Sequence, residues 1–444
     1  NSPVFVNKYK DGKLTIRKRV TKGDPNKVFT FKVKLKGPEG TVPKGKFTVS
    51  RRSLDNQGNP VNEAQRESAW TKLKRAAGNL VDSLKPKDAK AAEGYGPQGS
   101  VVKSGVTGTV KWELYENGHM VFSPVSGSTG QMSFVGDSNW RAEKANINSI
   151  SFTGTINAPE DSSELFEGLK NVASIDTTNF TTNGVTSMSS MFKGTQKLKK
   201  IDVSRFDMSQ VGTTAAMFYT TGIVELDLSA WTTPKLTSTV SMFEDSTCMT
   251  KLNISGLNTE KVINMRSMFK GLSRLETLDV STLKTGEVVN MDLMFKGMFE
   301  LKTLDLRNFD TRKVKTMKGM FEDVRDLTSL DISSFDTSKV TDMSNMFAGV
   351  SSLQQLDLSN FNTAKVNKFS NMFASSRPLE TKLEKIYVSQ DFNISAGTEF
   401  NNVFQNQVKL RGGNGSFLVN PASADKTWLR IDRPGAKGYF TQKP

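Results

Sequence analysis

The chain has 444 residues, of which 36% are hydrophobic and 24% charged, so it can bury a sizeable core and has room for two or three domains. A single cysteine and a single histidine exclude a disulfide scaffold and a cysteine- or histidine-rich metal site, and they argue against a hydrolase triad. The net charge of +15 marks a basic protein, and because no run of about 18 apolar residues occurs, no transmembrane helix is predicted.

The positive charge is concentrated in the first hundred residues, which hold 22 Lys and Arg against 9 Asp and Glu. Two segments of this region, 13–20 and 29–36, alternate apolar and polar residues, which is typical of half-buried strands. Residues 63–84 place apolar side chains on one helical stripe, and the glycine-rich residues 86–106 are expected to form a linker. We therefore predict that residues 1–106 form a basic, mainly-β module with a helical insertion.

The outward face of these two strands forms a basic patch. It carries Arg17, Arg19, Lys32, Lys34 and Lys36. The patch is either a solvated surface whose lysines protect an edge strand, or it attracts an acidic polysaccharide or another acidic partner. Sequence-specific binding of nucleic acid is not expected, because no nucleic-acid-binding fold and no basic groove interleaved with aromatic residues is recognisable.

Lys18 is the residue of this region that suggests covalent chemistry. It lies on the apolar face of its strand, where an unpaired charge is costly. The two strands resemble the start of a Cna B-type β-sandwich, a stalk module of Gram-positive surface proteins. That resemblance implies an isopeptide bond between this lysine and an Asn or Asp side chain. The alternative is a lysine at the sandwich edge that extends its ammonium group to water.

A repeat with a phenylalanine every 25 or 26 residues runs through residues 159–373. The phenylalanines are Phe192, Phe218, Phe243, Phe269, Phe295, Phe321, Phe347 and Phe373. In the clearest unit, apolar residues follow a helical spacing over 340–347 and then alternate as in a strand over 353–361. Such a unit cannot bury its apolar face alone, so the units must stack. The sequence thus predicts an α/β solenoid of leucine-rich repeats, with a short helix and a short strand in each repeat.

Polar residues at the centres of the predicted strands form one outward column, which we call the aspartate column. It consists of Asp176, Asp202, Asp227, Asn253, Asp279, Asp305, Asp331 and Asp357. Carboxylates about 4.8 Å apart repel each other, and Lys200, Lys251 and Arg307 are expected to offset that repulsion together with the serines that follow the aspartates. Two interpretations remain open: a structural hydrogen-bond ladder, and a binding stripe for a cationic or polyhydroxylated ligand or for calcium.

Three motifs recur in fixed register: LeuAspLeuSer-x-Phe, AspThrSerLysValThr-x-Met and Met-Phe-x-Gly. They resemble the 26-residue repeat of BspA-type bacterial leucine-rich-repeat surface proteins, and the resemblance covers about residues 107–444. It implies an N-terminal cap at 107–158, in which Asn117-Gly118 predicts a hairpin turn, and a C-terminal cap at 374–444. Both ends of an open strand ladder need such caps.

The resemblance implies a secreted, non-catalytic adhesin at the bacterial cell surface or cell wall that binds a host or extracellular-matrix protein or glycan. Two alternatives are a structural stalk or cell-wall spacer without a ligand, and a carbohydrate-active enzyme that uses two carboxylates. No nucleophile elbow, phosphate loop or metalloprotease motif occurs, so we expect no enzymatic activity, metal or cofactor.

The repeats at 211–260 are the most irregular part of the solenoid. Trp231 replaces the usual phenylalanine there, and Asn253 interrupts the aspartate column. We therefore expect the ligand to bind near these coils. Because the chain starts at Asn1 and shows no signal peptide, we interpret it as an ectodomain fragment.

The resemblance of the N-terminal strands predicts a covalently linked Lys18. The intact mass of the protein should then be lower than the sequence mass by one ammonia (Asn partner) or one water (Asp partner). A Lys18→Arg variant should show its full sequence mass. An unmodified mass for the wild-type chain would rule out the bond.

Overall fold

The computed structural model describes residues 29–31, 47–49, 96–395 and 397–443. The chain divides into two compact units, Asn1–Lys90 and Ala91–Pro444, and each is described by itself.

The described part of the first unit is a pair of short strands. β1 (Phe29–Phe31) and β2 (Phe47–Val49) pair in antiparallel fashion. β1 coincides with the start of the strand predicted at 29–36. Lys18, the basic patch and the helix predicted at 63–84 lie outside the described residues, so those expectations stay predictions.

The second unit begins with an antiparallel meander of β3 (Val101–Thr107), β4 (Val110–Tyr115) and β5 (His119–Pro124). The hairpin predicted at Asn117-Gly118 is confirmed, because β4 and β5 pair on either side of it. Gly118 has a φ of 76°, which glycine adopts without the steric penalty of a side chain. β3 occupies residues that the sequence analysis placed at the end of a linker, and its pairing with β4 makes it part of the sheet.

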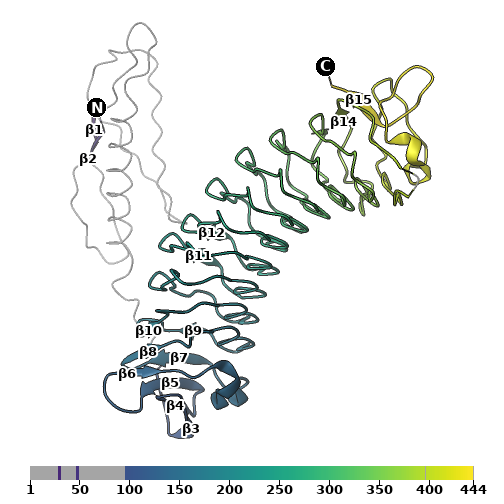
Figure 1. Ribbon diagram of the computed structural model, residues 1–444. Coiled ribbons are helices and arrows are strands. Elements are labelled where there is room, and N and C mark those ends of the chain that lie inside the picture. Colours follow the sequence, from purple (N-terminus) through teal and green to yellow (C-terminus); the bar gives the residue numbers. More distant parts are fainter. Residues whose placement is uncertain (1–28, 32–46, 50–95, 396, 444) are drawn as a thin grey trace. The chain divides into compact units, whose positions relative to one another are not determined.

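The meander passes into the solenoid by a change from antiparallel to parallel pairing. β7 (Ser149–Phe152) lies parallel beside β5, and β9 (Ser174–Ile175) lies beside β7, which completes a five-stranded sheet. A second, parallel sheet contains β6 (Thr129–Gln131), β8 (Thr155–Asn157) and β10 (Phe180–Thr181). The N-terminal cap therefore presents paired strands on which the first coils stack (Figure 1).

The later coils add short parallel strands to the side that carries the aspartate column, which we call the strand face. These strands are β11 (Glu225–Asp227), β12 (Lys251–Asn253), β13 (Gln355–Asp357), β14 (Lys385–Val388) and β15 (Phe440–Gln442). Between β12 and β13 the ladder is reduced to single bridges, which join Thr277 to Thr303 and Asp305 to Asp331.

The short helix predicted in each repeat is wrong. The described residues contain no α-helix, and their 3-10 helices lie in the caps. These are η1 (Val135–Asp137), η2 (Asn139–Glu143), η3 (Pro421–Ser423) and η4 (Lys426–Trp428). Where the helix was expected, Asn345 has a φ of 57°, which interrupts any right-handed helix. The fold is a β-solenoid and not an α/β solenoid.

The backbone hydrogen bonds explain why the spacing of apolar residues suggested a helix. The N–H of Asn345 donates to the carbonyl of Ser370 in the next coil at 2.9 Å, whereas the N–H of Met346 closes a tight turn onto Met343 at 3.2 Å. Successive tight turns also bring every third or fourth side chain to one face. Turns and helices therefore produce similar apolar patterns over such a short segment.

None of the helices in the described residues is long and apolar enough to cross a membrane.

The C-terminal cap closes the ladder with a strand from the end of the chain. β15 pairs with β14, and the N–H of Lys443 donates to the carbonyl of Val388 at 2.9 Å. The buried carboxylate of Asp432 accepts the backbone N–H groups of Asn414 and Ser416 at 2.8 and 2.9 Å. The glycine-rich loop of residues 412–416 is thereby fixed against the end of the solenoid.

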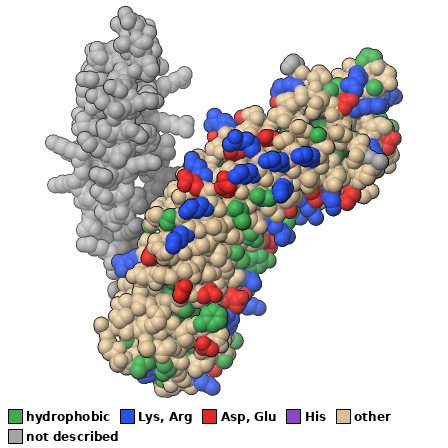
Figure 2. Space-filling model, viewed as in Figure 1, with side chains coloured by type: hydrophobic (Ala, Val, Ile, Leu, Met, Phe, Trp, Pro, Cys, Tyr) green, Lys and Arg blue, Asp and Glu red, His purple; other side chains and the backbone are tan. Residues whose placement is uncertain are grey.

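Several charged side chains on the solenoid pair between neighbouring coils. The pairs are Glu225–Lys251, Glu244–Lys270, Glu276–Lys302 and Lys296–Glu322. Each pair joins residues of opposite charge that occupy the same position in successive coils. Figure 2 shows the two signs next to each other on the visible face. Exposed pairs of this kind contribute about 0–1 kcal/mol each.

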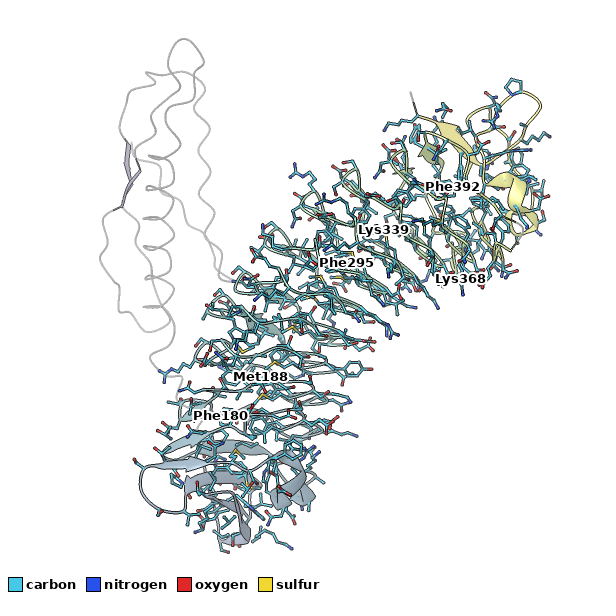
Figure 3. All side chains as sticks on the ribbon, in the orientation of Figure 1. Phe180, Met188, Phe295, Lys339, Lys368 and Phe392 are labelled. Atoms are coloured by element: carbon cyan, nitrogen blue, oxygen red, sulfur yellow. The ribbon has the colours of Figure 1, made fainter. Side chains whose placement is uncertain are left out.

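A column of stacked phenylalanines runs through the core, and Figure 3 labels one of its members, Phe295. From Phe166 to Phe404 the repeat phenylalanines are 0% exposed, and successive ring centroids lie 5.5 to 6.0 Å apart. The neighbouring repeat methionines are buried as well. Each coil therefore buries its largest side chain against the coils before and after it.

Phe295 tests this packing, because it stacks on Phe269 and Phe321 at 5.7 and 5.8 Å. Phe295→Ala should lower the free energy of unfolding by about 3–5 kcal/mol, since it leaves a cavity between two rings. Denaturant unfolding followed by circular dichroism measures the change. Phe417→Ala, at a half-exposed ring, is the matched control and should cost far less. A loss below about 1 kcal/mol for Phe295→Ala would contradict the stacked core.

His119, the only histidine, is buried in the N-terminal cap. Its Nδ1 and Nε2 lie 2.7 and 2.8 Å from the hydroxyls of Ser149 and Ser151. Burial lowers the pKa of His119 below its usual value of 6.5, because desolvation disfavours the charged imidazolium.

Below pH 6.5 the unfolded chain therefore takes up a proton on His119 that the folded chain resists. Stability from this group is complete above that pH and decreases as the pH falls towards the folded pKa. We expect the melting temperature to fall between about pH 7.5 and about pH 5.5, and to fall less in His119→Gln. Calorimetry at a series of pH values checks this, and an identical pH dependence in both proteins would contradict it.

Candidate functional site

The aspartate column lies on the strand face, and all eight residues make the same local hydrogen bond. In each, Oδ1 accepts the backbone N–H of the residue two positions later, at 2.9 to 3.1 Å. This bond holds the turn that follows the strand. Asn253 accepts the same hydrogen bond through its amide oxygen, so the carboxylate charge is not needed for the turn. The column therefore has a structural role within each coil, and its carboxylates apart from Asp305 and Asp357, which pair with Arg307 and Lys443, remain available to a ligand.

The basic residues predicted to offset this charge have different partners. Arg307 forms a two-pronged ion pair with Asp305, with Nε and Nη2 contacts of 3.0 and 2.6 Å. Lys251 pairs with Glu225 and not with the column. Lys200 is exposed in a segment that forms no regular strand. Most of the column is therefore held by backbone N–H groups and not by cations.

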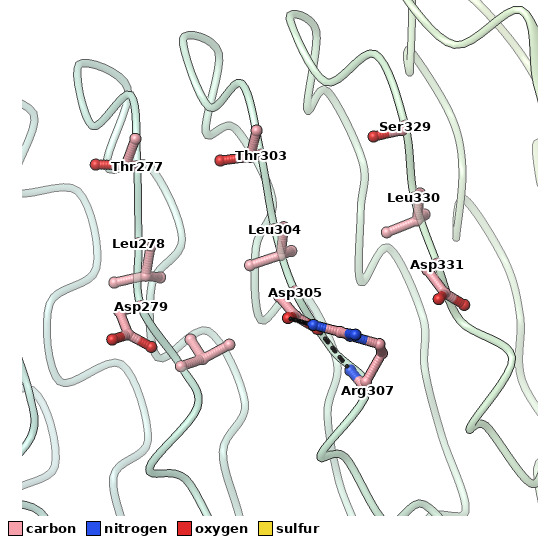
Figure 4. A pocket seen from close by; sticks show the side chains of 11 residues that line it. Thr277, Leu278, Asp279, Thr303, Leu304, Asp305, Arg307, Ser329, Leu330 and Asp331 are labelled. Atoms are coloured by element: carbon pink, nitrogen blue, oxygen red, sulfur yellow. Dashed lines mark hydrogen bonds and ion pairs between the residues drawn. The ribbon is translucent and has the colours of Figure 1, made fainter. Parts of the chain in front are cut away.

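An open groove of about 510 Å³ crosses three successive coils of the strand face (Figure 4). Three parallel rows line it: the hydroxyls of Thr277, Thr303 and Ser329, the side chains of Leu278, Leu304 and Leu330, and the carboxylates of Asp279, Asp305 and Asp331. Arg307 and Val280 complete the lining. The groove thus combines an apolar floor with hydroxyls on one side and charges on the other.

The groove coincides with the stretch where the strand ladder is reduced to single bridges. Leu278 and Leu304 are each 6% exposed and Leu330 is partly buried, whereas Leu356 in the regular strand β13 is 1% exposed. In β11 and β12 the equivalent Leu226 is 4% exposed and Leu252 is partly buried, so the leucines of the groove are covered about as well as those of regular strands.

The three carboxylates of the groove stay ionised far below neutral pH. Hydrogen bonding from the Arg307 side chain lowers the pKa of Asp305 to about 2. Hydrogen bonds from Ser281 and Ser333 lower the pKa of Asp279 and of Asp331 below the usual range. With one guanidinium among three carboxylates, the groove is negatively charged. Among the described residues no group of three or more acidic, histidine or cysteine side chains is placed to hold a metal ion.

The irregular coils at 211–260 do not form this groove. Trp231 is 3% exposed and donates its indole N–H to the carbonyl of Val203 at 2.9 Å. Leu257, which also replaces a phenylalanine, is buried. The substitutions are accommodated in the core, so they do not create a surface feature. Trp231 therefore offers no exposed side chain to a ligand, whereas Asn253 is exposed, and a site near these coils stays a prediction.

The sequence analysis named four residues of the groove, namely Asp279, Asp305, Arg307 and Asp331. It missed the hydroxyl row, which is Thr277, Thr303 and Ser329. These residues directly precede the inward leucines in three successive repeats. Earlier coils have charged residues at that position, such as Glu225 and Lys251, and this change of residue type is a signal from which the hydroxyl row could have been predicted.

The family described as "Mycoplasma protein of unknown function, DUF285" matches three overlapping stretches of the chain, 160–277, 246–329 and 325–425. Together they cover more than half of the sequence. The chain belongs to the DUF285 family. The DUF285 stretches include every coil that lines the groove.

No curated protein matches the chain. Among solved structures, the crystal structure of a leucine rich cell surface protein from Faecalibacterium prausnitzii A2-165 is similar to it at 13% sequence identity and a TM-score of 0.30. That match covers 65% of this chain and 96% of the other.

Proposed function

We propose that this chain is a non-catalytic cell-surface adhesin that binds a host or extracellular-matrix macromolecule in the groove of its strand face. The observation that carries the proposal is the groove itself, an open surface three coils long with a row of leucines between hydroxyls and carboxylates. The motifs that resemble BspA-type surface proteins support a place at the cell surface.

The lining of the groove favours an extended ligand that bears basic side chains or many hydroxyls. The carboxylates of Asp279 and Asp331 carry charge at neutral pH, and the Arg307 guanidinium makes its two-pronged ion pair with Asp305 while it also favours the charged form of Asp331. They can therefore accept hydrogen bonds from ammonium, guanidinium or sugar hydroxyl groups. The leucine row adds apolar contact along the same direction, which suits a segment of polypeptide or a glycan chain.

The state of the aspartates argues against the carbohydrate-active alternative. A glycosidase needs a general acid whose pKa is raised, so that it holds a proton at neutral pH. All three groove carboxylates have lowered pKa values. The groove also gives less support to the alternative of a structural stalk or cell-wall spacer, because a protein without a ligand needs no groove on its repetitive face.

The test compares two double variants of the full chain. Asp279→Asn with Asp331→Asn removes charge inside the groove, and Asp176→Asn with Asp227→Asn removes the same charge from the same column outside it. Asn253 shows that asparagine keeps the turn, so both variants should fold. A glycan and matrix-protein array first identifies the ligand of the wild-type chain. The groove variant should then bind about tenfold more weakly, as expected for the loss of two charged contacts, and the control should bind as the wild type does.

Thr303→Arg provides a second test, because it fills the centre of the groove without touching the core. It should abolish binding while the melting temperature stays within about 2 °C of the wild type, as for most surface substitutions. Equal affinity of the wild type, the groove variant and Thr303→Arg would show that the ligand binds elsewhere.

A further inference from the structure

A second surface lies on a different set of turns and has the opposite charge. The same position of five coils is occupied by an exposed lysine, and we call this set the lysine column. It consists of Lys235, Lys261, Lys313, Lys339 and Lys365. Each lysine precedes a buried leucine or valine and lies three residues before the β-bridge that joins its coil to the next. The coil between Lys261 and Lys313 has Glu287 at this position.

Contacts between coils show that these side chains stack. The ammonium of Lys313 pairs with the carboxylate of Glu287 at 2.6 Å. The ammonium of Lys261 donates to the carbonyl of Pro234, the neighbour of Lys235, at 3.0 Å. Lysines at this position thus reach towards the preceding coil.

For Lys339 and Lys365 the preceding coil presents another lysine. The three C-terminal members of the column therefore follow each other with no acidic side chain between them at that position. Elsewhere on the solenoid a lysine is paired with a carboxylate at the same position of a neighbouring coil, as in Glu276–Lys302. Stacked like charges about 5 Å apart repel one another, so Lys339 and Lys365 do not contribute to stability as the paired lysines do.

The nearby carboxylates are engaged in their own turns. Asp310 is bound by Arg312 with contacts of 2.6 and 2.9 Å. Hydrogen bonds from the side chain and from the backbone N–H of Ser338, the latter at 2.8 Å, lower the pKa of Asp336, and Lys339 lowers it further. Lys315 adds a further exposed cation beside the column. Figure 2 shows Lys and Arg side chains gathered over the middle coils, where Figure 3 places Lys339.

We propose that the lysine column is a binding track for a linear sulfated polysaccharide, which lies along the axis of the stack. Regularly spaced cations on a rigid scaffold match a chain of regularly spaced anionic groups, and from Lys313 to Lys365 the coil spacing of about 4.8 Å provides one cation per step. Single-stranded nucleic acid is the less suitable polyanion, because the positions of the column carry no aromatic side chain on which bases can stack. The track does not depend on the strand-face groove, whose excess of carboxylates would repel such a polymer.

Heparin is the probe, and the full chain is used throughout. The column variant carries Lys261→Gln, Lys339→Gln and Lys365→Gln. The matched control carries Lys251→Gln, Lys296→Gln and Lys302→Gln, which remove the same charge from lysines that pair with a glutamate of a neighbouring coil. Both retain the basic N-terminal residues, so their contribution to heparin binding cancels in the comparison.

The column variant should bind heparin about tenfold more weakly than the control variant, with a shallower dependence on salt concentration. Its melting temperature should equal or exceed that of the wild type, because repulsion is removed, whereas the control loses ion pairs. Lys339→Arg with Lys365→Arg should keep full affinity. Neutral dextran should bind none of these proteins.

Three results would overturn the proposal. Equal losses of heparin affinity in the column and control variants would mean that net charge alone attracts the polymer. A lower melting temperature of the column variant would assign the lysines a structural role. Tighter, column-dependent binding of single-stranded DNA than of heparin would make nucleic acid the ligand class.

Discussion

The whole solenoid depends on hydrogen bonds and ring stacking between neighbouring coils. A coil such as 340–361 has too few internal bonds to hold its shape, and its amides at Asn345 and Phe347 are satisfied only by carbonyls of the next coil. The phenylalanine of each coil is covered only because another ring lies on either side. Both caps follow from this dependence, since the first and last coils would otherwise expose unpaired strands.

Sequence reasoning could predict the features that depend on one residue type at one place. The hairpin at Asn117-Gly118 follows from a turn that needs a left-handed glycine, and the burial of Phe295 follows from its place in the repeat. The prediction of a helix in each repeat was wrong because the left-handed φ of Asn345, which rules the helix out, leaves no trace in the spacing of the apolar residues. The burial of Trp231 was not predictable for a related reason. A large side chain that breaks the repeat pattern can be packed into the core when one indole hydrogen bond satisfies it.

The candidate surfaces show a similar division. The aspartate column was visible in the sequence because its residue type repeats, but the groove was not, because it depends on where the strand ladder is interrupted. The small net charge of the solenoid gave no indication of the lysine column. The residues after the first hundred have a surplus of only two positive charges, yet they separate carboxylates on the strand face from ammonium groups on another set of turns.

Because every coil presents the same positions to solvent, a duplication or loss of one coil changes both surfaces by one unit without disturbing either cap. Binding to a polymer through several identical contacts rises steeply with the number of contacts that engage together. Copy number of the repeat is therefore a direct control on avidity. Insertions inside a coil have no such freedom, because they would shift the left-handed residues, such as Ser267 and Asn371, out of line with their neighbours. Descendants of such a gene are expected to differ in whole coils and to be far more uniform in coil length.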